Sequence, residues 1–306
     1  MAVTSGTAIF NLDLSELIED AYERCGSELR TGYDMRTARR SMNLMTIEWA
    51  NRGINLWTID QGQIVMNTGQ AIYPIPVDTI DLLDTVTRTG SGDTQSDVTV
   101  SRISEPTYMS IPNKNATGRP VQVWINRQTG LTNTTTATLA STITATDTTI
   151  TLSDATQIAT SGFITIDSET IVYQNVSGNQ LLNCFRGQNN TTAAAHTSGA
   201  AIIEAFLPSI NVYPTPSAPG NQYTFVYYRM RRIQDAGNGV NIQDIPFRFL
   251  TCMVAGLAFY LSQKIAGAEG RMAWLKSEYE EQMLMASSED RDKAPDRYVP
   301  RNMMYA

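Results

Sequence analysis

The segment from residue 129 to residue 204 restricts the possible folds more than any other part of the chain. Thirteen threonines lie between Leu131 and Thr160, and the whole segment lacks lysine. Threonine favours β-strands, and the run TTITL alternates polar and apolar residues as a half-buried strand does. Further on, GFITIDSETIVYQNVSGNQLLNCFRG predicts three short strands joined by turns at DS and SGN. The sequence therefore predicts a small β domain in the middle of the chain.

The stretch DLSELIEDAYERCG, near the start of the chain, predicts an amphipathic helix. Asp13 suits the N-cap, Glu16 follows at the spacing of a capping box, and Gly26 suits the C-terminal stop. The outer face of this helix is acidic, with Glu16, Glu19, Asp20 and Glu23. We expect this face to be solvated, and a charged surface for a partner is the alternative.

A second helix is predicted over DMRTARRSMNLMTIEWANRG, with Asp34 as its cap and Gly53 as its stop. Residues spaced three and four apart form one apolar stripe. The stripe consists of Met35, Ala38, Met42, Met45 and Trp49. The helix is therefore expected to bury this face.

Three arginines, Arg36, Arg39 and Arg40, lie near the start of the second helix and mostly off its apolar stripe. One interpretation is an exposed basic face that pairs with the acidic first helix. The other is a set of salt bridges toward a neighbouring subunit, which would also involve Glu16 and Glu19.

The chain returns to helical periodicity after residue 245. Pro246 suits a first helical turn, and the residues from 249 to 261 are almost continuously apolar. The short length of this run and its flanking polar residues argue against a membrane span, so a buried helix is expected. A further helix is predicted over residues 268–286, with methionine, leucine and tyrosine at helical spacing.

Short strands punctuated by glycine and proline are predicted between the helices and the threonine-rich segment. VQVWINRQ before that segment and LPSINVYP after it are predicted to be neighbouring strands, so that the insert replaces the turn between them. The segment FLPSINVYPTPSAPGNQYTFVYYRMRR is predicted to be a hairpin with Pro219, Gly220 and Asn221 at its tip.

The predicted fold class is α+β, with a bundle of N- and C-terminal helices, a β-sheet extension and an inserted small all-β domain. The predicted parts are a helical core (1–53 and 245–286), a β extension (54–128 and 206–244), the inserted β domain (129–205) and a C-terminal arm (287–306).

The composition suits a globular protein and excludes several classes of site. The net charge of −7 and the pI near 4.8 argue against a protein whose main task is to bind phosphates. Cys25, Cys184 and Cys252 are odd in number and far apart, so neither a disulfide framework nor a metal motif is expected. This cysteine spacing points to synthesis in a reducing cytoplasm. The start of the chain is not expected to be a signal peptide, because it lacks a basic n-region.

The single histidine, His196, stands in the small-residue stretch NNTTAAAHTSGA. A catalytic histidine needs an orienting carboxylate and a nucleophile, and neither is marked nearby, so a surface loop residue is expected. The sequence contains no phosphate-binding loop or nucleophile elbow, and its paired carboxylates are of a kind that almost any chain of this length contains. The sequence thus predicts a non-enzymatic protein without metal or cofactor.

The last twenty residues, SSEDRDKAPDRYVPRNMMYA, show no helix or strand period. One interpretation is a plain tail. The other is an extended arm that orders on a partner, which better explains the apolar residues near its end. The candidate anchors are Tyr298, Val299, Met303, Met304 and Tyr305.

Two segments together resemble the head-to-tail connector (adaptor) proteins of short-tailed bacteriophages. ELIEDAYERCG…RTARRSMNLMTIEWANRGINLWTI looks like the start of these proteins. YPTP…YTFVYYRMRRIQDAG…IQDIPFRFLTCMVAGLAFYLSQKI looks like their closing segment. The resemblance covers about residues 12–126 and 206–286. The order of the elements carries it rather than any one motif.

The insert has a resemblance of its own. The stretches Ile166-Asp-Ser-Glu-Thr-Ile, Cys184-Phe-Arg-Gly and Thr192-Ala-Ala-Ala-His are similar to those of a small β module that recurs in phage tail and virion proteins. The standard adaptor lacks this module. We expect the insert to pack against its copy in the next subunit or against an outer virion protein.

The adaptor resemblance implies a ring of about twelve subunits that joins the portal protein to the tail nozzle or tube and extends the DNA channel. It implies a location in the neck or tail of the virion, with assembly in the host cytoplasm and without a membrane. Genomic DNA would pass through an acidic lumen without specific binding, and the C-terminal arm would dock on the portal.

Two alternatives stay open at the level of sequence. The chain could be another tail component, such as a tail-tube or nozzle protein, which should not bind the portal directly. It could also be a surface-binding module, with the threonine-rich segment recognising host glycan or the capsid. Phe163, Tyr173 and Phe185 are the few aromatic residues there that could stack on a sugar.

Overall fold

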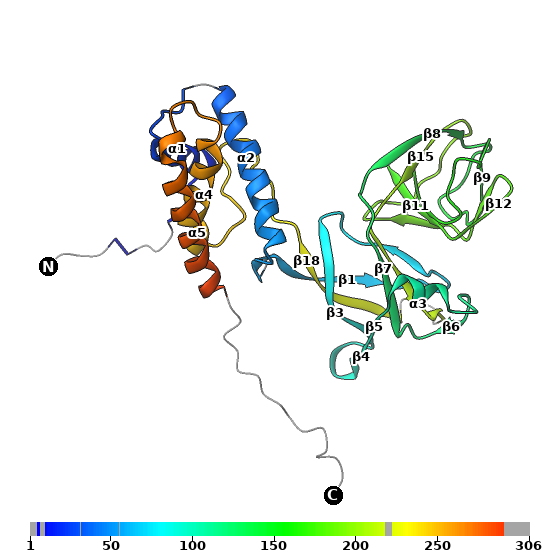
Figure 1. The fold of residues 1–306 in the computed structure, drawn as a ribbon. Helices are drawn as coiled ribbons and strands as arrows, with labels where there is room; N and C mark the ends of the chain where they lie inside the picture. The colour runs from blue at the N-terminus through cyan, green and yellow to red at the C-terminus, as the bar shows by residue number, and fades with distance from the viewer. Residues whose placement is uncertain (1–4, 7–9, 31, 55, 218–221, 291–306) are drawn as a thin grey trace, which may run out of the picture. The chain divides into compact units, whose positions relative to one another are not determined.

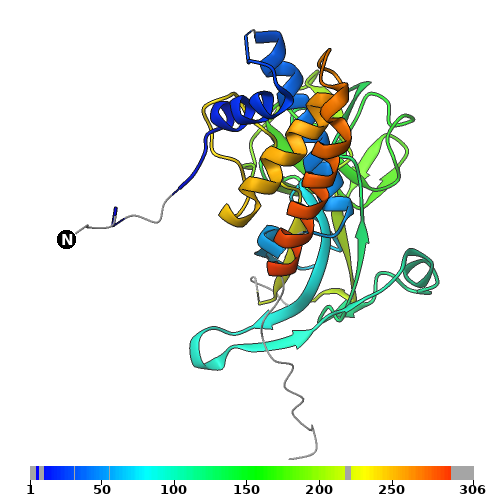
Figure 2. The same ribbon diagram turned by 60° about the vertical axis from the view of Figure 1, so that its left-hand side comes forward.

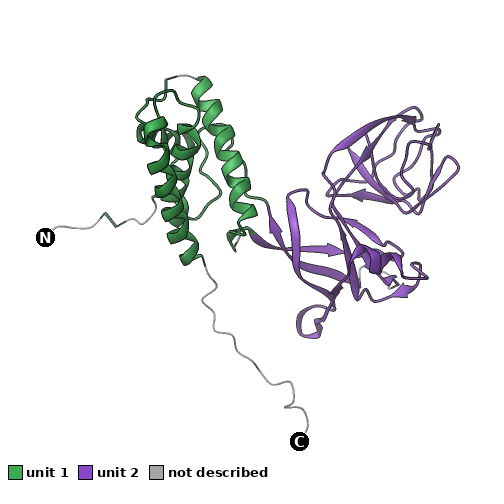
Figure 3. Ribbon diagram, in the orientation of Figure 1, with its two compact units in different colours: residues 1–58, 232–306 green, residues 59–231 purple. Residues whose placement is uncertain are grey.

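The computed structural model describes residues 5–6, 10–30, 32–54, 56–217 and 222–290. Helices and strands are both abundant, which confirms the predicted α+β class. The chain divides into two compact units (Figure 3). Residues 1–58 and 232–306 form the helical unit, and residues 59–231 form the β unit.

The helical unit is built from both ends of the chain around one apolar core. Its helices are α1 (Leu14–Cys25), α2 (Gly32–Asn51), α4 (Leu250–Ser262) and α5 (Met272–Glu289), with 3-10 turns η1 (Leu56–Thr58), η3 (Phe247–Phe249) and η4 (Glu269–Arg271). Helices α4 and α5 lie side by side in both views (Figures 1 and 2). None of the described helices is long and apolar enough to cross a membrane.

Local signals place α1 as predicted. The Asp13 carboxylate accepts a hydrogen bond from the Glu16 amide at 2.9 Å, and the Glu16 carboxylate accepts one from the Asp13 amide at 3.0 Å. These two bonds form the capping box and satisfy two otherwise unpaired donors. Gly26 ends the helix with a φ of 77°, a conformation that glycine adopts without a steric penalty.

Helix α2 begins at Gly32, so the predicted cap at Asp34 is wrong. Asp34 lies in the first turn, and its carboxylate accepts a hydrogen bond from the Arg30 amide at 3.3 Å. An acidic residue in the first turn still complements the helix dipole. The predicted apolar stripe is buried at Ala38, Met42, Met45 and Trp49 and half-buried at Met35.

Helix α4 is the centre of the helical unit, and most of its residues are buried. Gly256 allows a close approach of its neighbours. A Cβ atom built on this residue would lie 2.5 Å from the Met45 sulfur and 2.7 Å from the Tyr279 ring. Helix α5 extends to Glu289, three residues beyond the predicted end at 286. The next residue, Asp290, forms an ion pair with Arg248.

The helical unit also includes two segments that were predicted to belong to the β extension. The Trp57 ring packs 4.9 Å from the Phe249 ring, and its indole N–H donates to the Asp244 carbonyl at 3.0 Å. Ala236 is buried in the helical core. The boundaries therefore lie near residues 58 and 232 instead of 53 and 245, because these linkers bury apolar side chains against the helices.

The β unit contains two four-stranded sheets that share one apolar core. The first sheet has the order β1 (Ile59–Val65), β18 (Thr224–Arg231), β3 (Thr79–Thr89), β4 (Ser96–Thr99). The second has the order β2 (Ile72–Pro74), β16 (Ser209–Tyr213), β7 (Gln122–Asn126), β5 (Ser101–Arg102). The smaller elements are η2 (Gly92–Thr94), α3 (Glu105–Met109), β6 (Thr117–Gly118) and β17 (Thr215–Pro216).

The predicted neighbours on either side of the insert do pair. Strands β7 and β16 are antiparallel, with Val123 opposite Val212. The predicted hairpin between β16 and β18 is wrong, because β18 pairs with β1 and β3 in the other sheet. Apolar residues of both strands point into the shared core. The predicted hairpin tip, 219–221, lies outside the described residues.

The insert folds into a five-stranded and a three-stranded sheet around its own core. The predicted three strands over 162–187 are in fact five, because the chain reverses more often than the two turn signals indicated. The strands of the insert are β8 (Thr132–Thr138), β9 (Ile150–Thr151), β10 (Gly162–Ile166), β11 (Glu169–Tyr173), β12 (Asn175–Ser177), β13 (Gln180–Leu182), β14 (Phe185–Gln188) and β15 (Ala201–Ala205).

Amide side chains attach the insert to the second four-stranded sheet. The Gln174 side chain accepts from the Ala71 amide at 2.7 Å and donates to the Gly69 carbonyl at 2.8 Å. Gln70 donates to the Gln188 side chain at 2.9 Å. A small apolar cluster that includes Phe163 and Leu207 lies at the same junction. The insert is thus bound to the β unit by specific contacts in addition to its two chain connections.

Candidate functional site

The three arginines predicted for subunit contacts lie together on α2. Arg36 and Arg40 are exposed and Arg39 is half-buried. With Asn43 and Leu44 they line a hollow of about 310 Å³ on the helical unit. Helical spacing of three and four residues brings the guanidinium groups to one region of the helix surface.

These arginines form no ion pair with any residue that the structure describes. The first interpretation from sequence, pairing with the acidic helix α1 within the chain, is therefore not seen. Lys264 adds a fourth positive charge nearby, and its ammonium donates to the Ser41 hydroxyl at 2.7 Å. Burial and the charge of Arg40 lower the pKa of Lys264. Positive charge is thus concentrated here without a carboxylate partner.

The acidic face of α1 is partly used within the chain. Glu16 is exposed and closes the capping box. Asp20 lies 3.4 Å from Arg24, which also pairs with Glu278 of α5 at 2.7 Å. Glu19 and Glu23 are exposed and make no ion pair with the described residues. Two carboxylates of this face therefore stay available to a partner.

Apolar side chains accompany the arginines on α2. Tyr33, Leu44 and Ile47 are 65%, 51% and 58% exposed. Together with Arg36 and Arg40 they follow helical spacing along the side of α2 opposite its buried stripe. Aromatic residues and arginine surrounded by apolar area are typical of protein–protein interfaces. The predicted arm residues Tyr298, Val299, Met303, Met304 and Tyr305 lie outside the described residues.

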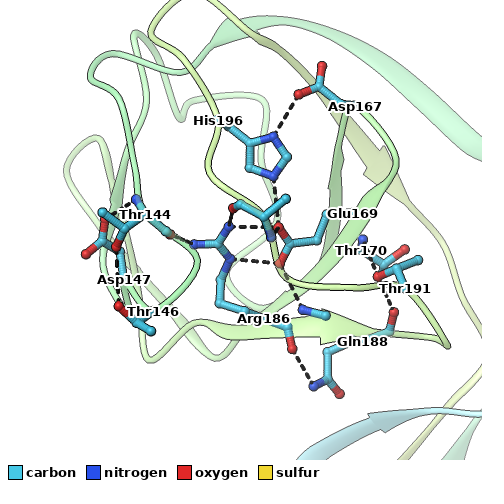
Figure 4. A network of polar contacts seen from close by, with 12 residues as sticks. Thr144, Thr146, Asp147, Asp167, Glu169, Thr170, Arg186, Gln188, Thr191 and His196 are labelled. Atoms are coloured by element: carbon cyan, nitrogen blue, oxygen red, sulfur yellow. Dashed lines mark hydrogen bonds and ion pairs between the residues drawn. The ribbon is translucent and has the colours of Figure 1, made fainter.

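The prediction that His196 is a surface loop residue is wrong. The side chain is buried, and its two ring nitrogens lie 2.7 Å from the Asp167 carboxylate and 2.8 Å from the Glu169 carboxylate (Figure 4). Carboxylates accept hydrogen bonds, so a ring nitrogen that carries a hydrogen can donate it to one of them. The error arose because both carboxylates are more than 25 residues away in sequence.

Glu169 is the centre of this polar cluster. Its carboxylate accepts two hydrogen bonds from Arg186, at 2.8 and 2.7 Å, and further ones from the Gly187 and Ala194 amides at 2.8 and 3.0 Å. Burial alone would raise the pKa of Glu169. The hydrogen bonds from Arg186, the Ala194 amide, His196 and the Gly187 amide instead lower it to about 2.

The cluster joins parts of the insert that are distant in sequence. Arg186 also donates to the carbonyl oxygens of Thr144 and Ala194, so its guanidinium links two loops to strand β11. The carboxylate oxygens of Glu169 are fully occupied, which leaves no free acceptor for substrate chemistry. The arrangement therefore holds the fold of the insert together. The three stretches that resemble the phage β module contain the four charged or histidine side chains of the cluster: Asp167, Glu169, Arg186 and His196. That resemblance is the signal that could have revealed the cluster.

The three cysteines are buried and form no disulfide. Burial raises the pKa of Cys25 to about 11 and those of Cys184 and Cys252 to about 12. All three are therefore protonated thiols at neutral pH. Within the described ranges, no group of three or more His, Cys, Asp or Glu residues could hold a metal ion.

The sequence was also compared with known protein families and with curated proteins. No protein family matches the sequence, and no curated protein is significantly similar to it.

Proposed function

We propose that the chain is a structural subunit of a bacteriophage virion, a head-to-tail adaptor that forms a ring between the portal and the tail. The order of the elements supports this proposal, since two N-terminal helices, a β unit and two C-terminal helices match the resemblance given above. The inserted module extends from the strand pair β7 and β16 and leaves that pairing intact. An enzyme is the weaker candidate, because both carboxylate oxygens of Glu169, at the centre of the largest polar cluster described above, already accept hydrogen bonds within the protein.

The observation that carries the proposal is the separation of unpaired charge on the helical unit. Arg36, Arg39 and Arg40 have no carboxylate partner among the described residues, and neither Glu19 nor Glu23 has a cationic one. Two complementary surfaces that do not meet within one chain can meet between copies. Such a contact is heterologous, and a heterologous contact generates a ring when its rotation closes after a whole number of subunits.

Native mass spectrometry of the purified chain, alone and mixed with its portal ring, tests the proposal. We expect about twelve copies of the chain to bind the portal ring, the number that the adaptor resemblance implies. A stable ring that has no affinity for the portal would identify a tail-tube or nozzle component instead. A chain that neither forms rings nor binds the portal would overturn both assignments.

Charge reversal tests the surfaces directly. Arg36→Glu with Arg40→Glu should prevent assembly on the portal, and adding Glu19→Arg with Glu23→Arg should restore it in part, because opposite charges face each other again. Arg30→Glu is the matched control, since the ion pair that its side chain forms with Glu28 is highly exposed. Equal loss of assembly in the control, or no rescue by the second pair, would remove these surfaces from the interface.

A further inference from the structure

The β unit contains a cleft at the junction between the insert and the second four-stranded sheet. Two cavities meet there, of about 250 Å³ and about 660 Å³. They share four lining residues, Ile72, Trp124, Ser161 and Asn211. The larger volume falls within the range of roughly 300–1,000 Å³ that is typical of small-ligand sites.

Strand β16 directs two buried polar side chains into this cleft. Ser209 and Asn211 alternate with Ile210 and Val212, which point into the apolar core on the other side of the sheet. Ser209 is 1% exposed and Asn211 is 6% exposed. The described residues form no hydrogen bond with either side chain, and neither belongs to the fully enclosed polar groups without a partner, so their polar atoms open onto the cleft. Both also line the smaller cavity.

The polar atoms of Ser209 and Asn211 open onto the cleft, where water or a ligand can satisfy them. Polar side chains in the interior are usually satisfied within the protein. The neighbouring amide of Gln174 is satisfied by the Ala71 amide and the Gly69 carbonyl. The amide of Asn211 thus stands out as a donor and acceptor that is free to bind a ligand.

Aromatic side chains form one wall of the cleft. Trp124 lies opposite Asn211 in the register of β7 and β16, so both side chains occupy the same face of the sheet. The Trp124 ring stacks on Tyr108 of α3, with 5.3 Å between centroids and 26° between planes. This stacking fixes the indole beside the free amide. The wall offers an apolar surface next to hydrogen-bonding groups.

Two charged side chains line the two cavities, and each makes hydrogen bonds within the protein. The Lys114 ammonium donates to the carbonyl oxygens of Met109 and Ile111, both at 3.1 Å. The Glu204 carboxylate accepts from the Ala159 amide at 3.1 Å. Lys114 and Glu204 are the only charged residues among the described ones that line the cleft. Their opposite charges leave the lining without net charge, which favours a neutral ligand.

We propose that this cleft binds a neutral oligosaccharide, with a pyranose ring against Trp124 and its hydroxyl groups bonded to Asn211, Ser209 and Ser161. A sugar ring combines an apolar C–H face with hydroxyl groups that both donate and accept, which matches an indole beside an amide and two hydroxyls. An extended peptide fits less well, because β16 and β7 are paired on both sides and offer no free strand edge.

The site requires both the insert and the sheet that carries it. Trp124 and Asn211 lie on strands outside the threonine-rich segment, whereas Ser161 lies within it. The isolated segment 129–204, which the sequence suggested as a glycan-binding module, is therefore expected not to bind. The proposal is independent of assembly on the portal, so either can fail while the other holds.

Saturation-transfer NMR and isothermal titration calorimetry on the full chain test the site with three probes, methyl glucoside, maltotriose and tri-N-acetylchitotriose. We expect at least one trisaccharide to bind, and to bind more tightly than the monosaccharide, because two joined cavities can hold more than one ring. If no trisaccharide binds at millimolar concentration, the cleft is only a solvated junction and the proposal is wrong.

Variants assign the binding to the cleft. Asn211→Leu removes the free amide with little change in volume, so affinity should fall at least about tenfold, the equivalent of 1.4 kcal/mol, while the fold is kept. Ser209→Ala is a smaller change that should also weaken binding. Trp124→Phe should reduce affinity. Trp274→Phe is the matched control and should leave affinity unchanged, because Trp274 is an exposed residue of the helical unit. Unchanged affinity in all three cleft variants would overturn the proposal.

Discussion

Arg186 and Glu169 form a bidentate ion pair in which the two side chains are only 6% and 1% exposed. The pair lies inside a small β module whose own core is built mainly from isoleucine, leucine and alanine. A buried ion pair is strongly destabilising when one partner is removed, because the other charge is left uncompensated. The pair and its hydrogen bonds thus decide whether the loops of the insert stay in place.

Arg186→Met should destabilise the insert by about 3–5 kcal/mol, and Arg186→Lys should cause a smaller loss because it keeps the charge without the bidentate geometry. Chemical denaturation followed by circular dichroism measures both changes. Arg88→Met in strand β3 is the control, since its pair with Asp97 is more exposed and should matter little. Equal losses at the two sites would contradict the prediction.

The stability of the insert should depend on pH through Glu169. The pKa of Glu169 is about 2 in the folded chain and 4.5 in the unfolded chain. A lowered folded pKa contributes stability that is present above about pH 4.5 and is lost as the pH falls toward 2. The contribution at neutral pH is about 3 kcal/mol. In urea unfolding between pH 6 and pH 2, the difference between the wild type and Glu169→Gln should therefore shrink. A constant difference would show that ionisation of Glu169 does not contribute.

Gly256→Ala should destabilise the helical unit. The new methyl group would meet the Met45 sulfur and the Tyr279 ring, and overpacking of this kind costs about 1–3 kcal/mol. Gly270→Ala is a matched control, because a Cβ atom there meets nothing within 4 Å. Thermal unfolding of the two variants gives the comparison. A Gly256→Ala chain as stable as the control would show that the helices can move apart at little cost.

Truncation after Asp290 should abolish binding to the portal while leaving unfolding of the helical unit unchanged. This prediction rests on the proposed arm, whose candidate anchors follow that residue. Truncation after Ala286 is a less specific test, because it also removes Asp290 and leaves Arg248 without its carboxylate partner. Surface plasmon resonance on immobilised portal rings measures the loss. Undiminished affinity after removal of residues 291–306 would exclude the arm as the docking element.

Signals that act over a few residues were readable from the sequence. The capping box of Asp13 and Glu16, the stop at Gly26 and the buried stripe of α2 were all predicted, because each depends on neighbours within about one or two helical turns. The pairing of β7 with β16 was predicted as well. It followed from recognising the insert as a replacement for a turn.

The tertiary structure alone decided the features that join distant residues. His196 is buried because β11 and its preceding turn bring Glu169 and Asp167 to it across almost thirty residues. Strand β18 pairs with β1 and β3 rather than with β16, because apolar side chains of both strands fill one core between two sheets. Likewise, alternation places Asn211 on the polar face of β16, but only the packing of the insert encloses that face. Burial and hydrogen bonding are properties of the assembled chain, so local periodicity could not reveal them.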